Sequence, residues 1–287
     1  MSGTLLRHAR LRTERAWFRL RLLRHGLRPS DIGLLAGIRK SGNTYLRFLL
    51  GNYAALREDP TRGPLSYPEL SARLGETLGW REVTPPLARD QGLGALGIER
   101  FYYTHHSYTR VYEGLKVVSV YRNPLDYLVS FYFYKYAGRP GLETRYAGPQ
   151  ELLFQLDHFF AEYTSFVGTP ALRVAYEDLY EQPAQQLRRV LSFFGAPDID
   201  GALIDRAAAH SAQDVIRAEE DRSGPIHSPP GFKGRFVRDG SIGQHHRYFG
   251  SEEWRQLEEI ASRHGVSLDQ FRFEPAPSSE LAVSGAR

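Results

Sequence analysis

A lysine stands inside a glycine-containing segment that directly follows a short apolar run. Residues 37–44 read Gly-Ile-Arg-Lys-Ser-Gly-Asn-Thr, and a helical pattern continues to residue 56. When a strand passes through such a turn into a helix, backbone N–H groups and the positive end of the helix dipole point at a bound anion. The sequence therefore predicts a phosphate-binding loop that contains Lys40.

The loop departs from the nucleotide triphosphatase pattern G-x-x-x-x-G-K-[ST]. Asn43 stands where that pattern has lysine, and Lys40 lies three residues earlier. Only four lysines occur beside 33 arginines, so a lysine here indicates that a compact ammonium group is needed. NTPases also need an aspartate after a neighbouring strand to hold magnesium, whereas the apolar run 117–121 leads into Arg122. These features favour a phosphate ester held by direct cationic contacts, with a P-loop kinase as the alternative.

A second group of candidate phosphate ligands follows the run 117–121. Arg122 comes first, Asn123 and Pro124 suit the cap and first turn of a helix, and Ser130 lies two turns along it. A guanidinium and a hydroxyl together can hold a terminal phosphate by charge-assisted hydrogen bonds. Taken alone, Arg122 also fits a partner in a surface ion pair, and Ser130 also fits an ordinary helix position.

These segments resemble the sulfotransferase family that uses 3′-phosphoadenosine-5′-phosphosulfate (PAPS). Residues 39–45 resemble that family's 5′-phosphosulfate loop, and Arg122 with Ser130 resembles its 3′-phosphate site. Residues 176–179 (Tyr-Glu-Asp-Leu) resemble the segment whose tyrosine approaches the adenine. Residues 237–243 resemble the segment that closes over the 3′-phosphate. The four blocks follow one another in the family's order and spacing.

The resemblance implies a cytosolic-type sulfotransferase with PAPS as donor, 3′-phosphoadenosine-5′-phosphate (PAP) as product, and no metal. The residues that it assigns to nucleotide binding are Arg39, Lys40, Ser41, Gly42, Asn43, Thr44, Tyr45, Arg122, Ser130, Tyr176, Arg238 and Gly240.

The family's general base is usually the histidine of a Lys-Thr-His run after the second strand. Residues 103–106 (Tyr-Thr-His-His) occupy that place. The resemblance therefore assigns His105 as the base and leaves His106 as its rival. A hydrogen-bonded structural histidine at the end of a strand is the alternative for either ring.

Two replacements remove cations that the family pattern would supply. Tyr103 stands in place of a lysine near the transferred group, so that charge is either lost or supplied by Arg39. Asp239 stands in place of a phosphate-binding lysine, and a negative charge there is unfavourable beside an anion. We expect Lys233 or Arg235 to compensate.

The implied reaction is sulfuryl transfer from PAPS to a hydroxyl of a small-molecule acceptor, a metabolite or natural product. His105 would take the acceptor's proton while Lys40 neutralises charge on the departing nucleotide. Carbohydrate and lipid acceptors are alternatives, as is a catalytically degenerate fold that binds polyanions. We expect residues 57–97 and 219–234 to shape the acceptor pocket. The aromatic side chains of residues 131–134 and 136 are expected in the core of a helix, with a place in the acceptor pocket as the alternative.

Short apolar runs alternate with helical patterns along the chain, and this alternation positions the candidate residues. The expected strands are 34–38, 100–104, 117–121 and 172–176, and the expected helices are 44–56, 124–136 and 183–194. Strands separated by helices form βαβ units. We therefore expect an α/β fold, a single domain with a central parallel sheet flanked by helices and a P-loop-like phosphosulfate-binding loop. Ligands of such sheets bind beyond the carboxyl ends of the strands, where the candidate residues lie.

The positive charge of the chain is concentrated near its N-terminus. Residues 5–28 hold eight arginines and one glutamate, a formal charge of +7, so the rest of the chain carries −3. We expect a basic helical arm over residues 1–28, a sulfotransferase domain over 29–275 and a flexible tail over 276–287. The arm is expected to pack on the domain, and peripheral contact with an anionic membrane or an organelle-targeting role are the alternatives.

The composition narrows the class of protein further. Cysteine is absent, which excludes disulfides and thiolate chemistry. No apolar run approaches the ~20 residues that span a bilayer, and arginines interrupt any secretory signal. A cytoplasmic protein is therefore expected, without a nucleic-acid partner because its basic charge is confined to the arm. The preference for Arg, Ala and Gly over Lys suggests a GC-rich, bacterial genome, and the sequence leaves the oligomeric state open.

Overall fold

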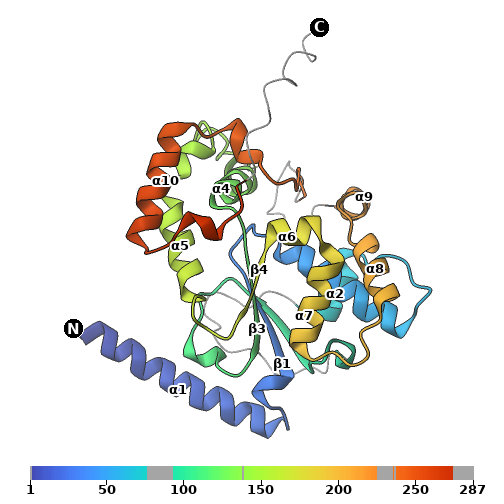
Figure 1. Ribbon diagram of the computed structural model, residues 1–287. Coiled ribbons are helices and arrows are strands. Elements are labelled where there is room, and N and C mark those ends of the chain that lie inside the picture. The colour runs from blue at the N-terminus through green and yellow to red at the C-terminus, as the bar shows by residue number, and fades with distance from the viewer. Residues whose placement is uncertain (1, 76–92, 138, 225–234, 236, 274–287) are drawn as a thin grey trace.

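The computed structural model describes residues 2–75, 93–137, 139–224, 235 and 237–273 of the chain (Figure 1). Helices and strands alternate through most of this part. The helices are α1 (Ser2–Arg24), α2 (Asn43–Glu58), α3 (Tyr67–Leu74), α4 (Pro124–Tyr132), α5 (Gln155–Ser165), α6 (Tyr176–Glu181), α7 (Pro183–Phe194), α8 (Gly201–His210), α9 (Gln213–Ser223) and α10 (Ser251–Arg263). The strands are β1 (Ile32–Ala36), β2 (Arg100–Thr104), β3 (Lys116–Tyr121) and β4 (Leu172–Ala175).

The four strands form one parallel sheet in the order β2-β1-β3-β4. Leu34 of β1 pairs with Tyr102 of β2 on one side and with Val117 of β3 on the other. Because successive side chains of a strand point to opposite faces, Leu34 and Leu35 enter different hydrophobic cores. This sheet confirms the expected α/β fold, and its parallel strands bring their carboxyl ends to one edge.

Helices cover both faces of the sheet. The core that contains Leu35 is completed by α2, α7 and α8, which lie to the right of the strands in Figure 1. A second, largely aromatic core joins α4, α5 and α10 on the other side. The helices that follow β1 and β3 therefore start at the same edge of the sheet from opposite faces.

The predicted strands and helices are present, and their ends differ by a few residues. β1 ends at Ala36 rather than at residue 38, because the chain leaves the sheet at Gly37 to form the loop. β4 ends at Ala175, and Tyr176 is the first residue of α6. The helix expected over 124–136 is an α-helix only as far as Tyr132, and a π-helical turn follows at Phe133–Ala137.

The basic arm is a helix that docks on the domain through part of its length. Phe18 and Leu22 of α1 are buried in a core beneath the sheet. Arg15 forms a 2.5 Å ion pair with Glu113, and Arg19 donates a hydrogen bond to the carbonyl of the same residue. Among the described helices, none combines the length and apolar character needed to cross a bilayer. The predicted tail, 276–287, lies outside the described residues.

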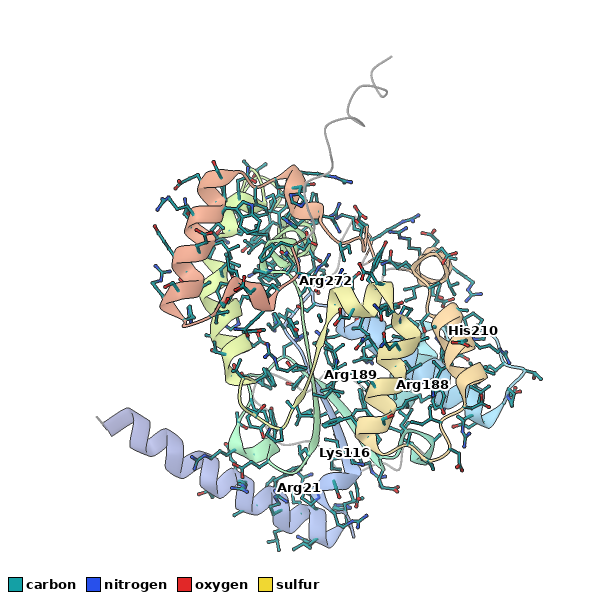
Figure 2. The ribbon with its side chains drawn as sticks, in the orientation of Figure 1. Arg21, Lys116, Arg188, Arg189, His210 and Arg272 are labelled. Atoms are coloured by element: carbon teal, nitrogen blue, oxygen red, sulfur yellow. The ribbon has the colours of Figure 1, made fainter. Side chains whose placement is uncertain are left out.

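Two basic side chains fasten helices to other parts of the domain (Figure 2). Lys116, at the start of β3, donates hydrogen bonds to the carbonyl of Gly97 at 2.9 Å and to that of Phe194 at the end of α7. Arg272 forms two hydrogen bonds with the Glu181 carboxylate of α6, at 2.7 and 2.9 Å. Lys116 therefore has a structural role that Lys40 does not share.

A buried carboxylate ties the C-terminal part of the domain to α4. Asp126 accepts hydrogen bonds from the backbone N–H of Gly243 and of His245, both at 2.8 Å, and from His245 Nδ1 at 2.9 Å. Arg122 lies 3.7 Å from the same carboxylate. Burial alone would raise the pKa of Asp126, but the His245 hydrogen bonds and the Arg122 charge outweigh it, so the pKa lies below its ordinary value.

Replacing this carboxylate tests how strongly it holds the fold. Asp126→Asn should lower the free energy of unfolding at pH 7 by about 3 kcal/mol, because it breaks a buried, charged hydrogen-bond network. A group with a depressed pKa stabilises above its unfolded pKa of about 3.9 and loses that effect in more acid solution. The gap between wild type and variant in urea unfolding should therefore be constant from pH 7 to about 5 and shrink below pH 4.

Asp205→Asn, at an exposed position of α8, is the matched control and should change the free energy of unfolding by less than about 0.5 kcal/mol. A gap between wild type and Asp126→Asn that stayed constant down to pH 3 would contradict the assignment.

Candidate active site

A cavity of about 740 Å³ opens at the carboxyl edge of the sheet, between the loop after β1 and the start of α4. Its volume falls in the usual range for small-molecule sites. All of the predicted site residues except Ser41 line it: Arg39, Lys40, Gly42, Asn43, Thr44, Tyr45, His105, Arg122, Ser130, Tyr176, Arg238 and Gly240. Ser41 is buried beside them, and its Oγ has no hydrogen-bond partner among the described residues.

The loop after β1 owes its shape to one amide side chain and to two residues with left-handed backbone. Asn43 donates from Nδ2 to the carbonyl of Ile38 at 2.8 Å. Its amide fills the space beside Gly37, where an added Cβ would lie 1.7 Å from Asn43 Oδ1. Lys40 and Gly42 have φ angles of 59° and 97°. Asn43 therefore braces the turn from the position at which a nucleotide triphosphatase carries its lysine.

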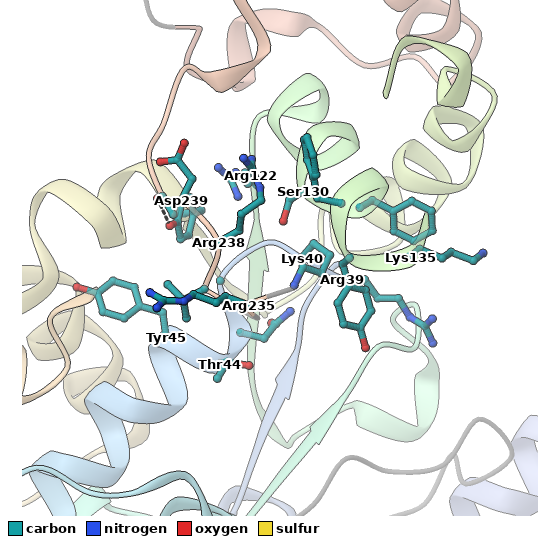
Figure 3. Close-up of a pocket in the computed structure, with 18 of the residues that line it drawn as sticks. Arg39, Lys40, Thr44, Tyr45, Arg122, Ser130, Lys135, Arg235, Arg238 and Asp239 are labelled. Atoms are coloured by element: carbon teal, nitrogen blue, oxygen red, sulfur yellow. Dashed lines mark hydrogen bonds between the residues drawn. The ribbon is translucent and has the colours of Figure 1, made fainter. Parts of the chain in front are cut away.

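Lys40 points into the cavity (Figure 3). Its Nζ lies 4.3 Å from the centroid of the Tyr134 ring, a cation–π contact. Burial, and next the nearby Arg122 guanidinium, lower the pKa of Lys40 to about 7, while Glu220 acts in the opposite direction. The surroundings therefore disfavour the ammonium form of Lys40, and an anion beside it would stabilise that form.

Arg122 and Ser130 face the same space as Lys40, and Arg238 reaches toward it from the C-terminal segment (Figure 3). Arg122 donates from Nη2 to the carbonyl of Ser241 at 2.9 Å. Its Nε is buried and has no hydrogen-bond partner in the described part of the chain. A buried guanidinium N–H without an acceptor is costly, and a bound phosphate oxygen would satisfy it.

The Tyr176 ring contacts both the loop after β1 and the segment after β3. The Arg122 guanidinium lies 4.3 Å from its centroid, and an added Cβ at Gly42 would lie only 2.4 Å from its edge. Its hydroxyl donates to the carbonyl of Gly240. Burial raises the pKa of Tyr176 to about 12, although the Arg122 charge acts in the opposite direction, so the hydroxyl keeps its proton and remains a donor.

Residues 237–240 line the cavity and are held in place by α9. Arg217 of α9 donates to the carbonyl of Asp239, and Gln213 donates to that of Gly240 at 3.0 Å. Arg238 lies in a cation–π contact with the Phe133 ring, 4.0 Å from its centroid. These contacts place a cation on the side of the cavity opposite the loop after β1.

The Asp239 carboxylate is directed away from Lys40 (Figure 3). It accepts hydrogen bonds from the Ser241 N–H at 3.3 Å and from Ser241 Oγ at 2.6 Å, and Arg247 lies 3.8 Å away. The negative charge of Asp239 is therefore offset by hydrogen bonds within its own turn and by Arg247. Arg235, one of the two expected compensating cations, lines the cavity and also pairs with Asp221 at 2.8 Å, whereas Lys233 lies outside the described residues.

Both ring nitrogens of His105 have partners. Nδ1 lies 2.8 Å from the carbonyl of Gly37, and Nε2 lies 2.5 Å from the Tyr103 hydroxyl. Since a carbonyl only accepts, Nδ1 carries the proton and Nε2 accepts from the tyrosine. His105 lines the cavity, and the neighbouring His106 does not.

The expectation that the aromatic run of α4 belongs to the helix core is wrong for Phe133 and Tyr134. Both line the cavity, together with Lys135, because the π-helical turn at Phe133–Ala137 changes the face that each residue presents. Such a turn has no sequence signature, so an α-helical period misplaces these rings. Phe131 packs in the second core and also lines the cavity, whereas Tyr136 is buried in that core as expected.

The loops expected to shape an acceptor pocket contribute little within the described residues. None of residues 57–75 or 93–97 lines the cavity, and from residues 219–224 none does either. The remainder of both predicted loops, residues 76–92 and 225–234, lies outside the described part. No group of three or more His, Asp and Glu side chains that could hold a metal ion occurs among the residues described.

Comparison with known proteins agrees with this geometry. Retinol dehydratase in complex with androsterone and the inactive cofactor PAP superposes with a TM-score of 0.60 at 17% identity, covering 87% of this chain and 83% of that one. The same enzyme in complex with retinol and PAP gives 0.59 at 18%, covering 87% and 84%. Mouse sulfotransferase SULT7A1 complexed with PAP gives 0.55 at 19%, covering 83% and 85%.

These structures share the fold at low sequence identity. A comparison with curated proteins finds no match for this chain. The sequence profile of the sulfotransferase domain matches residues 30–266, which is most of the chain and includes every residue of the cavity described above. The chain therefore belongs to the sulfotransferase family.

Proposed function

We propose that this protein transfers the sulfuryl group of PAPS to a hydroxyl of a small-molecule acceptor. The observation that carries the proposal is the convergence of Lys40, Arg122 and His105 on one cavity at the carboxyl edge of the sheet. A nucleotide with phosphates at both ends needs separate cationic sites at a fixed distance, and a reacting hydroxyl needs a base beside one of them. The cavity offers these groups together.

The residues present fit the two ends of the nucleotide. The loop after β1 offers Lys40, the Thr44 hydroxyl and the N-terminus of α2 to the phosphosulfate end. Arg122, Ser130 and Arg238 suit the 3′-phosphate, and the unpartnered Nε of Arg122 supports this assignment. The structures of retinol dehydratase and SULT7A1 in complex with PAP support the same choice of nucleotide.

The proposed reaction is an in-line displacement at sulfur. The acceptor oxygen forms a bond to sulfur while the bond from sulfur to the bridging oxygen breaks, and that electron pair leaves with PAP. Lys40 stabilises the charge that develops on the bridging oxygen, together with backbone N–H groups at the start of α2. His105 is the terminal proton acceptor, and it is favoured over His106 because only His105 lines the cavity.

The acceptor side of the cavity is aromatic. Tyr103, Phe131, Phe133 and Tyr134 line it beside the phosphate ligands. Rings of this kind bury apolar surface and suit a compact hydroxyl compound better than a heavily hydrated sugar. Retinol dehydratase, which shares the fold, is known in complex with androsterone and with retinol, and this supports an apolar small-molecule acceptor. Carbohydrates and lipids serve as the comparison classes in an acceptor panel.

Lys40 and Arg122 are expected to affect sulfuryl transfer and nucleotide binding to different degrees. Lys40→Ala should lower the single-turnover rate of sulfuryl transfer by about 100- to 1000-fold, because it removes charge stabilisation needed mainly in the transition state. Arg122→Ala should instead weaken PAP binding by about 100-fold, because it removes a charge-assisted fork from the bound nucleotide. Calorimetry with PAP and mass spectrometry of acceptor reactions measure the two effects.

A Lys116→Ala variant controls for loss of a lysine outside the cavity and should leave both quantities unchanged. Transfer at the wild-type rate by Lys40→Ala would overturn the mechanism. Turnover of ATP with magnesium, without binding of PAP, would overturn the proposed function.

The pKa of about 7 at Lys40 predicts a pH dependence of nucleotide binding. A bound anion raises the pKa of this ammonium, so binding takes up a proton, and the Lys40 contribution is complete below pH 7 and declines above it. The ratio of PAP affinities between wild type and Lys40→Met should therefore fall by up to about tenfold per pH unit above pH 7. Taking the ratio cancels the titration of the nucleotide phosphates, and a ratio that stays constant from pH 6 to 8.5 would contradict the prediction.

A further inference from the structure

The base of the proposed reaction is separated from the acceptor by a tyrosine. His105 Nδ1 donates to the Gly37 carbonyl at 2.8 Å, so that nitrogen is tied to the first residue of the phosphate loop. The lone pair of Nε2 receives the Tyr103 hydroxyl at 2.5 Å. An acceptor hydroxyl therefore meets the tyrosine oxygen at the place where it would otherwise meet the imidazole.

Tyr103 is in a position to contact the acceptor, because it lines the cavity with His105. Its ring and the His105 ring meet edge to face, with centroids 4.9 Å apart, which fixes the direction of the hydroxyl. On the other side the Arg47 guanidinium lies 5.2 Å from the centroid of the Tyr103 ring. Arg39 lines the same cavity, so two cations lie near a phenol that is otherwise buried.

We propose that Tyr103 is a catalytic residue that relays the acceptor's proton to His105. This inference rests on the proposed function and adds a member to its proton path. As the acceptor oxygen attacks sulfur, its proton moves to Tyr103 Oη, and the proton of Oη moves to His105 Nε2. The tyrosine ends neutral, the imidazole ends as an imidazolium held by Gly37, and the electron pair of the broken S–O bond leaves with PAP.

The surroundings of Tyr103 suit a relay rather than a permanent base. Burial raises the pKa of Tyr103, so the resting phenol keeps its proton and donates it to Nε2. Arg47 and Arg39 act in the opposite direction and favour the transient negative charge on Oη. The replacement of the family's lysine at this position thus brings in a group that can both give and take a proton.

The test is a single-turnover measurement with Tyr103→Phe, which keeps the ring and removes only the hydroxyl. We expect the transfer rate to fall by about 100-fold or more, with PAP affinity within about twofold of wild type. In mixtures of H₂O and D₂O, the wild-type rate should show a curved dependence on the deuterium fraction because two protons move together. The residual rate of the variant should show a linear dependence.

Tyr102→Phe is the matched control, since Tyr102 is the adjacent residue of β2 and faces the opposite core. It should transfer at the wild-type rate. An unchanged or raised rate in Tyr103→Phe, or a linear deuterium dependence in wild type, would overturn the relay while leaving sulfuryl transfer established. Absence of transfer by the wild-type protein, tested with the acceptor panel, would overturn the proposed function and the relay with it.

A separate observation concerns the outer face of α1. Trp17, Leu20 and Leu23 are 53%, 57% and 73% exposed, on the side of the helix opposite the buried Phe18 and Leu22. These three are half of the exposed large hydrophobic side chains among the described residues. We call Trp17, Leu20 and Leu23 the outer apolar face.

Arginines flank this face. The Arg21 guanidinium lies 4.6 Å from the Trp17 ring centroid, and Arg24 is exposed one turn further along the helix. Residues 5–28 carry a formal charge of +7. An aromatic ring, leucines and arginines on one exposed helix face are the combination that binds at the headgroup level of a membrane. A second copy of this helix would bring like charges together.

We infer that α1 attaches the protein to an anionic lipid surface. The full chain should sediment with phosphatidylcholine vesicles that contain phosphatidylserine, and much less with phosphatidylcholine alone. Replacing Trp17, Leu20 and Leu23 by Ser should weaken vesicle binding by about tenfold or more, because their apolar surface then stays in water. Phe154→Ser, at a side chain equally exposed elsewhere, should not change it. Equal binding by wild type and triple variant, or a dimer held together by these residues in gel filtration, would overturn the inference.

Discussion

The site depends on the packing of the Tyr176 ring, whose edge lies against the backbone of Gly42 and whose centroid lies 4.3 Å from the Arg122 guanidinium. The loop after β1 and the segment after β3 leave two neighbouring strands of the sheet. The tyrosine ring contacts both of them. Its hydroxyl donates to the carbonyl of Gly240 in the C-terminal segment, so one side chain contacts three parts of the chain.

Anionic and aromatic groups beside the cations of the site offset the repulsion between them. Lys40 and Arg122 repel one another in the cavity, and burial together with this repulsion lowers the pKa of Lys40. The buried Asp126 carboxylate beside Arg122 and the Tyr134 ring beside Lys40 each offset part of it. In the proposed function, a dianionic ligand would complete this balance.

Sequence reasoning identified the strands and the loop, and all but one of the residues that it assigned to the site line the cavity, because those features follow from local order along the chain. Residues that act across the fold were missed. Asp126 lies inside a helix where an acid is ordinary, and its partners are more than a hundred residues away. The hydrogen bond between Tyr103 and His105 depends on side-chain directions at the end of β2. The π-helical turn at Phe133–Ala137 interrupts the helical period from which side-chain orientation is predicted.

The fit between Gly37 and Asn43 constrains how this loop could have diverged from the loops of nucleotide triphosphatases. A lysine at position 43 would lose the hydrogen bond to the Ile38 carbonyl, and any side chain at position 37 would collide with the asparagine that now makes it. The ammonium at position 40 also relies on a left-handed backbone that the opposite design does not need. A replacement of Asn43 by lysine would therefore remove the hydrogen bond that braces the turn, even though both loop types share the glycine at position 37.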